Sequence, residues 1–127
     1  MLVNMKEMLE DASRNNYAVG GFNCSSLESG LAAIRAAEEM DMPFVLQFAP
    51  VHEQYIPVSV AGPLMLQLAR AAKTPVAVHL DHGGSVEWCL RALATGQALY
   101  GERRVNYAVG VREIGRASCR ERVYVLV

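Results

Sequence analysis

The stretch TPVAVHLDHGGS, residues 74–85, decides how the rest of the chain is interpreted. A short apolar run near its start predicts a buried parallel strand over residues 76–80. Residues two apart on a strand share a face, so His79 and Asp81 point the same way, and His82 lies where two glycines let the chain turn. Polar groups at the carboxyl end of a buried strand are typical of functional sites in α/β folds. The alternative is a strand that merely ends in polar loop residues.

Patterns of the same kind occur on both sides of this stretch. Apolar stripes at helical spacing predict helices, and short apolar runs that end in polar residues predict strands. The expected helices cover residues 5–14, 26–40, 60–72 and 86–95, and the expected strands cover residues 17–22, 44–48 and 76–80. Ser25 and Glu28 have capping-box spacing, and Gly96 is a natural residue to follow the last helix. The core-facing positions are expected to include Leu27, Leu31, Ile34 and Ala37 in the second helix and Val86, Cys89, Leu90 and Leu93 in the fourth.

The order of these elements predicts an α/β fold with a parallel sheet. One amino-terminal helix precedes three strand–helix units, and such alternation forms parallel sheets with right-handed crossovers. A (β/α)8 TIM barrel takes eight strands and ~250 residues, so three strands cannot close one. We therefore expect the first three strand–helix units of a truncated TIM barrel, with the outer edge of the third strand unpaired.

The composition is that of a soluble globular domain. Of the 127 residues, 52% are hydrophobic and 20% are charged, which is enough for one domain with a core. The formal net charge of −1 gives no reason to expect nucleic acid or an anionic membrane as a partner. No apolar run approaches the ~20 residues of a membrane span, and the first residues lack the features of a signal peptide. Three widely spaced cysteines, Cys24, Cys89 and Cys119, suit a reducing cytoplasm better than a disulfide framework.

The pattern changes toward the carboxyl end of the chain. Residues 107–111 have the composition of a strand, but the charges over residues 102–122 follow neither a helical nor a strand period. The segment EIGRASCRERV, residues 113–123, resembles the translation of a common sequencing adapter. We therefore assign residues 1–96 to the α/β domain and expect residues 97–127 to be a tail outside it, artefactual or disordered. The alternative is an arginine-rich segment that lies on the surface.

Three segments together resemble the amino-terminal part of class II ketose-bisphosphate aldolases, the zinc-dependent fructose- and tagatose-bisphosphate aldolase family. These segments are YAVGGFN at residues 17–23, PFVLQF at residues 43–48 and PVAVHLDHG at residues 75–83. The third segment is specific in combination with the other two. The resemblance covers residues 1–96. It implies a lyase of glycolysis that cleaves fructose 1,6-bisphosphate reversibly into dihydroxyacetone phosphate and glyceraldehyde 3-phosphate, assisted by zinc.

The resemblance also implies roles for individual residues. Asp81 matches the aspartate that protonates and deprotonates the C4 oxygen as the central carbon–carbon bond breaks or forms, and His82 matches the first histidine ligand of the catalytic zinc. A metal that acts as a Lewis acid on the ketose carbonyl stabilises the enediolate left after cleavage. Asn23 matches an asparagine that lies near the substrate. His79 belongs to the same motif as Asp81 and either orients its neighbours or serves as a core histidine.

Other positions depart from the family pattern. Ala49 and Pro50 stand where the family has a small hydroxyl residue after the second strand. The family's other two zinc histidines and its glycine-rich phosphate-binding loops come from later strands, and His52, the remaining histidine of this chain, does not correspond to them. A catalytic zinc needs three protein ligands and an open position. We therefore expect the 127-residue chain by itself to be inactive.

The resemblance further implies a phosphorylated sugar as the substrate and a homodimer or homotetramer as the complete protein. Fructose bisphosphate and tagatose bisphosphate are equally compatible with these segments. Two other functions are compatible with the pattern. One is a small non-catalytic α/β binding module, and the other is a different metal-dependent barrel lyase whose later ligands are not histidines.

Overall fold

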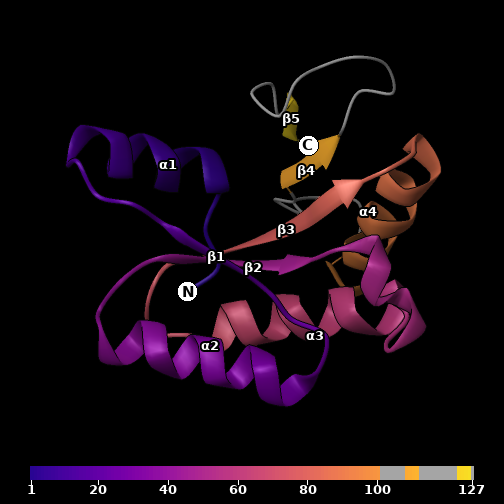
Figure 1. Cartoon of the computed structure of the whole chain (residues 1–127), viewed down its shortest axis with the longest axis horizontal. Coiled ribbons are helices and arrows are strands. Elements are labelled where there is room, and N and C mark those ends of the chain that lie inside the picture. The colour runs from indigo at the N-terminus through magenta and orange to yellow at the C-terminus, as the bar shows by residue number, and fades with distance from the viewer. Residues whose placement is uncertain (101–107, 112–122, 127) are drawn as a thin grey trace.

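The computed structural model describes residues 1–100, 108–111 and 123–126, with the side-chain surroundings of residues 1–95. One helix precedes alternating strands and helices, and two short strands follow (Figure 1). The elements are α1 (Met5–Arg14), β1 (Gly20–Asn23), α2 (Leu27–Glu39), β2 (Phe44–Phe48), the 3₁₀ helix η1 (Pro50–Gln54), α3 (Val58–Ala71), β3 (Val76–Gly83), α4 (Val86–Tyr100), β4 (Ala108–Val111) and β5 (Val123–Leu126). The predicted order of one helix and three strand–helix units is confirmed.

The five strands form one sheet in the order β1-β2-β3-β4-β5. The first three are parallel neighbours, with Gly20 opposite Phe44 and Phe44 opposite Val76. A helix lies in each connection between them, as parallel pairing requires. The predicted α/β class, with the first three strand–helix units of a TIM barrel, is therefore confirmed. None of the described helices has the length and apolar character needed to cross a membrane.

Side chains alternate between the two faces of the sheet, because successive residues of a strand point in opposite directions. The face beneath α2, α3 and α4 carries residues that are at most 3% exposed, namely Phe44, Leu46, Phe48, Val76, Val78 and Leu80. The other face carries Val45 and Ala77, which pack with Met5 and Met8 of α1. In Figure 1, α2 and α3 accordingly lie on one side of the sheet and α1 on the other.

The main chain before α1 ties that helix to the sheet. Leu2 forms a parallel bridge with Val76, the first residue of β3. The Val76 N–H donates to the Met1 carbonyl at 2.9 Å, and the Val3 N–H donates to the Val76 carbonyl at 3.0 Å. These bonds place the start of α1 over the amino ends of the central strands.

Side-chain caps account for where α1 and α4 begin. Asn4 accepts a hydrogen bond from the Lys6 N–H at 2.8 Å, and Ser85 accepts one from the Trp88 N–H at 3.2 Å. Each cap satisfies a backbone donor that has no partner within the helix. Asparagine and serine are both favoured at this position.

The capping box of α2 lies one residue later than predicted. Ser26 and Ser29 form it, each side chain accepting from the other's backbone N–H at 3.2 Å, so the expected box of Ser25 and Glu28 is wrong. The reason is that the chain stays extended beyond β1, since the Cys24 N–H still donates to a carbonyl of β2 at 2.9 Å. The helix can begin only after this bond.

Some element bounds also differ from the prediction. β1 begins at Gly20 and not at residue 17, and β3 continues through Gly83. α4 continues past Gly96 to Tyr100. A single glycine in a helix interior costs only about 1 kcal/mol, so Gly96 alone does not end the helix.

The buried helix faces are narrower than the apolar stripes suggest. Leu27, Val86 and Leu90 were expected to face the core, yet they are 43%, 71% and 60% exposed. Cys89 of α4 is buried as predicted, and so are Ile34 and Ala37 of α2. α2 and α4 each contact α3 and the sheet, which together cover less than the full apolar stripe of either helix.

The outer edge of β3 is paired, so the prediction of an open third-strand edge is wrong. β4 lies parallel to β3, with His79 opposite Ala108, and β5 lies antiparallel to β4. Residues 107–111, which have the composition of a strand, form one over Ala108–Val111, and residues 113–122 of the adapter-like segment lie outside the described residues. The assignment of residues 97–127 to a tail therefore stays a prediction.

Thr74, in the loop before β3, should tolerate the loss of its hydroxyl group. It is 4% exposed, and its Oγ1 has no hydrogen-bond partner among the described residues. A buried hydroxyl without a partner costs free energy, and valine has nearly the same shape without the polar atom. We expect Thr74→Val to leave the free energy of unfolding unchanged or to raise it by about 1 kcal/mol, measured by urea denaturation.

Thr95→Val is the matched control for this substitution. Thr95 is 8% exposed, and its Oγ1 donates to the Ala92 carbonyl at 2.6 Å. Removing a satisfied hydrogen bond is expected to lower the free energy of unfolding by about 1 kcal/mol. If Thr74→Val destabilises the chain as much as Thr95→Val, the hydroxyl of Thr74 has a partner and the prediction is wrong.

Candidate functional site

Polar side chains from β1 and β3 meet at the carboxyl end of the sheet. Asn23 ends β1, and Asp81 and His82 lie near the end of β3. The parallel register aligns Asn23 with Gln47 of β2 and Gln47 with His79 of β3. The topology therefore brings together residues that are almost sixty positions apart in the sequence.

A hydrogen bond joins the two outer strands of this group. The Asn23 Nδ2 donates to the Asp81 Oδ2 at 3.0 Å. The other carboxylate oxygen, Oδ1, lies 3.8 Å from the His82 Nε2. Asp81 is therefore oriented by an amide on one side and faces an imidazole on the other.

Exposure distinguishes Asp81 from His82. The side chain of Asp81 is 16% exposed, whereas that of His82 is 61% exposed. A partly shielded carboxylate such as that of Asp81 can exchange a proton with a bound molecule. An exposed imidazole such as that of His82 can still bind a ligand.

The backbone turns at His82 to create this arrangement. His82 has a φ of 55°, in the left-handed region, and the pairing of β3 with β4 shifts register between Leu80 and Gly83. A left-handed non-glycine residue costs roughly 1–2 kcal/mol. The turn breaks the strict alternation of the strand, so His82 points toward Asp81 and not to the opposite face of the sheet.

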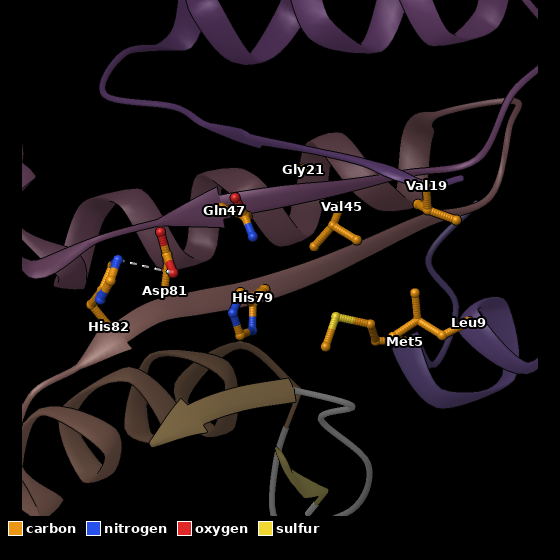
Figure 2. Close-up of a pocket in the computed structure, with 9 residues that line it drawn as sticks. All are labelled: Met5, Leu9, Val19, Gly21, Val45, Gln47, His79, Asp81 and His82. Carbon is orange, nitrogen blue, oxygen red and sulfur yellow. Dashed lines mark ion pairs between the residues drawn. The ribbon is translucent and has the colours of Figure 1, made fainter. Parts of the chain in front are cut away.

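A cavity of about 350 Å³ lies against the same face of the sheet (Figure 2). Gln47, His79, Asp81 and His82 line one end, and the other end is apolar and lined by Met5, Leu9, Val19 and Val45. In a complete barrel the apolar interior positions are filled by side chains in layers. The polar end is therefore the part of the cavity that matters for function.

His79 is buried beside this cavity. It is 3% exposed and lines the cavity next to Asp81 (Figure 2). Burial agrees with a core histidine, and its place beside Asp81 agrees with an orienting role. Both interpretations of His79 stay predictions.

Gln47 and Gly21 also line the polar part of the site, and sequence reasoning assigned neither of them a role there. A signal was present in the segment PFVLQF, since Gln47 is the only polar residue of an otherwise apolar buried strand. The period of two places Gln47 on the face of Val45, opposite the core. Gly21 belongs to a pair of glycines in the first strand, which indicates a place where neighbouring segments come close.

The loops at this end of the sheet are fastened by one carboxylate. Glu53 of η1 accepts from the Val58 N–H at 2.8 Å through Oε2 and forms an ion pair with Arg91 of α4 through Oε1. The Arg91 guanidinium also stacks over the Trp88 ring at 4.3 Å. These contacts hold the loop after β2 against the helix that follows His82.

The described donors do not complete a zinc site. No group of three or more histidine, cysteine, aspartate or glutamate side chains converges among the described residues, and a catalytic zinc needs three protein ligands. Asp81 and His82 form only a pair. His52 lies elsewhere, with its ring 5.9 Å from that of Phe48 and its Nδ1 buried without a partner among the described residues. The predicted incompleteness of the zinc site in this chain stays a prediction.

Comparison with known proteins finds similar sequences and structures. The sequence model of the family described as class II fructose-bisphosphate aldolase matches residues 3–99. A fructose-bisphosphate aldolase of Thermus caldophilus is 36% identical over 118 residues, which cover 91% of this chain and 38% of the relative. A fructose-bisphosphate aldolase of Staphylococcus aureus strain Mu50 is 40% identical over 100 residues, which cover 75% of this chain and 34% of the relative.

A solved structure shows a similar fold. The crystal structure of the YdjI aldolase from Escherichia coli K12 matches with a TM-score of 0.73 and 30% sequence identity, over 76% of this chain and 36% of that chain. The chain thus spans little more than a third of the length of the relatives it matches.

The bond between Asn23 and Asp81 can be measured by a double-mutant cycle. We expect Asn23→Ala and Asp81→Ala to be coupled by about 0.5–1 kcal/mol in the free energy of unfolding, because the bond links two strands but is partly exposed. Asn23→Ala combined with Asp11→Ala is the control, since Asp11 bonds Asn15 and Tyr17 instead. If the coupling energy between Asn23 and Asp81 is no larger than that between Asn23 and Asp11, the hydrogen bond does not contribute to stability and the prediction is wrong.

Zinc should not stabilise the 127-residue chain. A ligand that binds only the folded state raises the melting temperature by an amount that depends logarithmically on the ratio of its concentration to its dissociation constant. A single imidazole beside one carboxylate binds zinc weakly. We expect equal melting temperatures with equimolar zinc and with EDTA, for the parent chain and for His82→Ala. A zinc-dependent rise that His82→Ala abolishes would show that the described donors suffice.

Proposed function

The chain belongs to the class II fructose-bisphosphate aldolase family, and we propose that it forms the amino-terminal part of an aldolase. The proposed reaction is the reversible cleavage of a ketose bisphosphate, such as fructose 1,6-bisphosphate, into dihydroxyacetone phosphate and an aldehyde. For fructose 1,6-bisphosphate the aldehyde is glyceraldehyde 3-phosphate. Because the chain spans little more than a third of its relatives, the activity is proposed for the whole protein.

The observation that carries this proposal is the Asn23–Asp81 bond at the carboxyl ends of two parallel strands. Active sites of (β/α)8 barrels are built at this end. Family membership alone supports an aldolase, and the convergence of Asn23, Asp81 and His82 supports the location of its chemistry.

In the proposed reaction Asp81 moves a proton at the C4 oxygen of the sugar. During cleavage its carboxylate takes the C4 hydroxyl proton, the bond between C3 and C4 breaks, and C4 leaves as the carbonyl carbon of the aldehyde. The electron pair of the broken bond stays on the C1–C3 fragment as an enediolate, which becomes dihydroxyacetone phosphate when C3 is protonated. Asn23 holds the carboxylate in one orientation by donating to Oδ2, which leaves Oδ1 for the proton.

We further propose that the zinc dependence of the family applies to the whole protein, with His82 as one ligand. The exposure of the imidazole supports this role. Because no group of three donors converges among the described residues, the remaining ligands have to come from other residues.

The substrate and setting are proposals of the same kind. A phosphorylated sugar fits a cavity whose polar end offers amide, imidazole and carboxylate groups. We propose a cytoplasmic homodimer or homotetramer that acts in carbohydrate metabolism, with no nucleic acid or membrane as a partner. The net charge of −1 supports the last point.

One observation favours a second function, a non-catalytic α/β binding module. β4 and β5 continue the sheet beyond β3, so the third strand does not end in an unpaired edge. A self-contained module needs further strands of this kind, because they cover the edge of β3. A cooperative melt of a stable monomer would support this alternative.

The 127-residue chain by itself should not cleave fructose 1,6-bisphosphate. Its described residues supply the proton-transfer group but no complete metal site, and loss of a catalytic metal removes the main stabilisation of the enediolate. We expect turnover equal to a blank without protein in a coupled assay with added zinc. The Staphylococcus aureus aldolase serves as the positive control, and its Asp81-equivalent substitution should lower kcat by at least about 10²-fold.

Two outcomes would contradict these expectations separately. Turnover by the purified chain that Asp81→Asn abolishes would overturn its predicted inactivity while supporting the site. Unchanged kcat in the substituted relative would remove the proposed role of Asp81.

A further inference from the structure

Gly21 lies inside β1 although its backbone does not require glycine. Glycine in a strand interior is roughly 0.5–1 kcal/mol less favourable than alanine because it loses more conformational freedom on folding. Glycine is often needed where φ is positive, but the φ of Gly21 lies outside the left-handed region. Another cause must explain the glycine at this position.

The space above Gly21 provides that cause. A Cβ atom on Gly21 would meet the Cδ, Nε2 and Oε1 atoms of Gln47, each at 3.0 Å. Gln47 lies on β2, two residues beyond Val45, the register partner of Gly21. The Gln47 side chain therefore leans back across β1, and its carboxamide fills the volume that a side chain at position 21 would take.

The carboxamide of Gln47 faces the candidate site. Gln47 lines the cavity together with His79 and Asp81 (Figure 2). None of the hydrogen bonds between described residues uses its side chain. A carboxamide offers two donors and one acceptor, and few polar groups of this kind orient a ligand in a largely preformed pocket.

We propose that Gly21 and Gln47 act as a pair in which Gly21 is a positioning residue. Gly21 leaves the room that holds the Gln47 carboxamide against β1, and from there the carboxamide hydrogen-bonds a hydroxyl group of a bound phosphorylated sugar. The steric part of this inference stands on the structure alone, whereas the contact with the sugar rests on the proposed function.

A double-mutant cycle tests the steric part on the 127-residue chain. The proteins are the parent, Gly21→Ala, Gln47→Ala and the double variant, compared by melting temperature. In the Gln47→Ala background we expect Gly21→Ala to raise the melting temperature by roughly 2–4 °C, because alanine restricts the unfolded chain. With Gln47 present this gain is expected to vanish, because the carboxamide must move.

Gly20→Ala is the matched control on the same strand. A Cβ at Gly20 would meet the ring of Phe22 at 3.0 Å and not Gln47, so its effect should not depend on residue 47. In ¹⁵N spectra, Gly21→Ala should also shift the side-chain NH₂ signals of Gln47 more than Gly20→Ala does. Equal effects of Gly21→Ala in both backgrounds, with unchanged Gln47 signals, would overturn the pair.

Titration with fructose 1,6-bisphosphate tests the contact with the sugar. We expect it to shift the Gln47 NH₂ signals of the parent chain, and we expect both Gln47→Ala and Gly21→Ala to weaken binding roughly fivefold, the value of one neutral hydrogen bond. Equal binding by all variants would overturn the contact. Binding by none of them, the parent included, would overturn the contact in this chain but would leave the substrate proposed for the whole protein untouched, while the melting cycle still decides the steric pair.

Discussion

Because β1, β2 and β3 pair in parallel and in fixed register, Asn23, Gln47 and His79 fall in one row across the sheet. A slip of one residue would move each strand's side chains to the opposite face. Such a slip would expose Leu46, which is 0% exposed, and burying a leucine of this kind contributes about 1.5–3 kcal/mol. The apolar core on one face thus fixes which polar residues meet on the other.

The site depends on this alignment more than on any loop. Asn23 and Asp81 come from strands separated by β2, so their 3.0 Å bond forms only if both strands hold their places beside it. The Glu53–Arg91 pair secures the loop after β2 against α4 on the other side of the site. The Asp81 carboxylate has the Asn23 amide on one side and the His82 imidazole on the other, so it is oriented before a substrate arrives. Proton transfer requires such an orientation.

The sequence predicted those features that depend on short-range patterns. A short apolar run located β2 with its correct bounds, and the polar cluster after residue 78 located Asp81 and His82. The exposed faces of α4 escaped prediction, because the width of the buried stripe is set by neighbours that the pattern does not contain. The Gly21–Gln47 contact escaped it too, since it joins two strands whose register only the fold defines. The roles of Asn23, His79, Asp81 and His82 stay predictions, because geometry alone does not show chemistry.

Three non-glycine residues in the described part of the chain have left-handed backbone conformations, two of them at helix ends and one at the candidate site. Among the described residues, Asn16, Asp41 and His82 have positive φ without being glycine. Asn16 and Asp41 each follow the cap of a helix, and the next residue in each case donates back to the helix, at 3.1 Å from Tyr17 to Ala12 and at 3.0 Å from Met42 to Ala37. Such bonds end helices and account for both residues.

His82 lies within β3 and not at the end of a helix, so helix termination does not explain its φ of 55°. The same short region contains a register shift in β3, a buried histidine and a glycine that makes room for a carboxamide on the neighbouring strand. Departures from local backbone and packing preferences cluster where a fold loses stability in favour of function. The concentration of these exceptions at one end of three strands is therefore independent physical support for placing the chemistry there, because it relies on backbone geometry and packing and not on likeness to any relative.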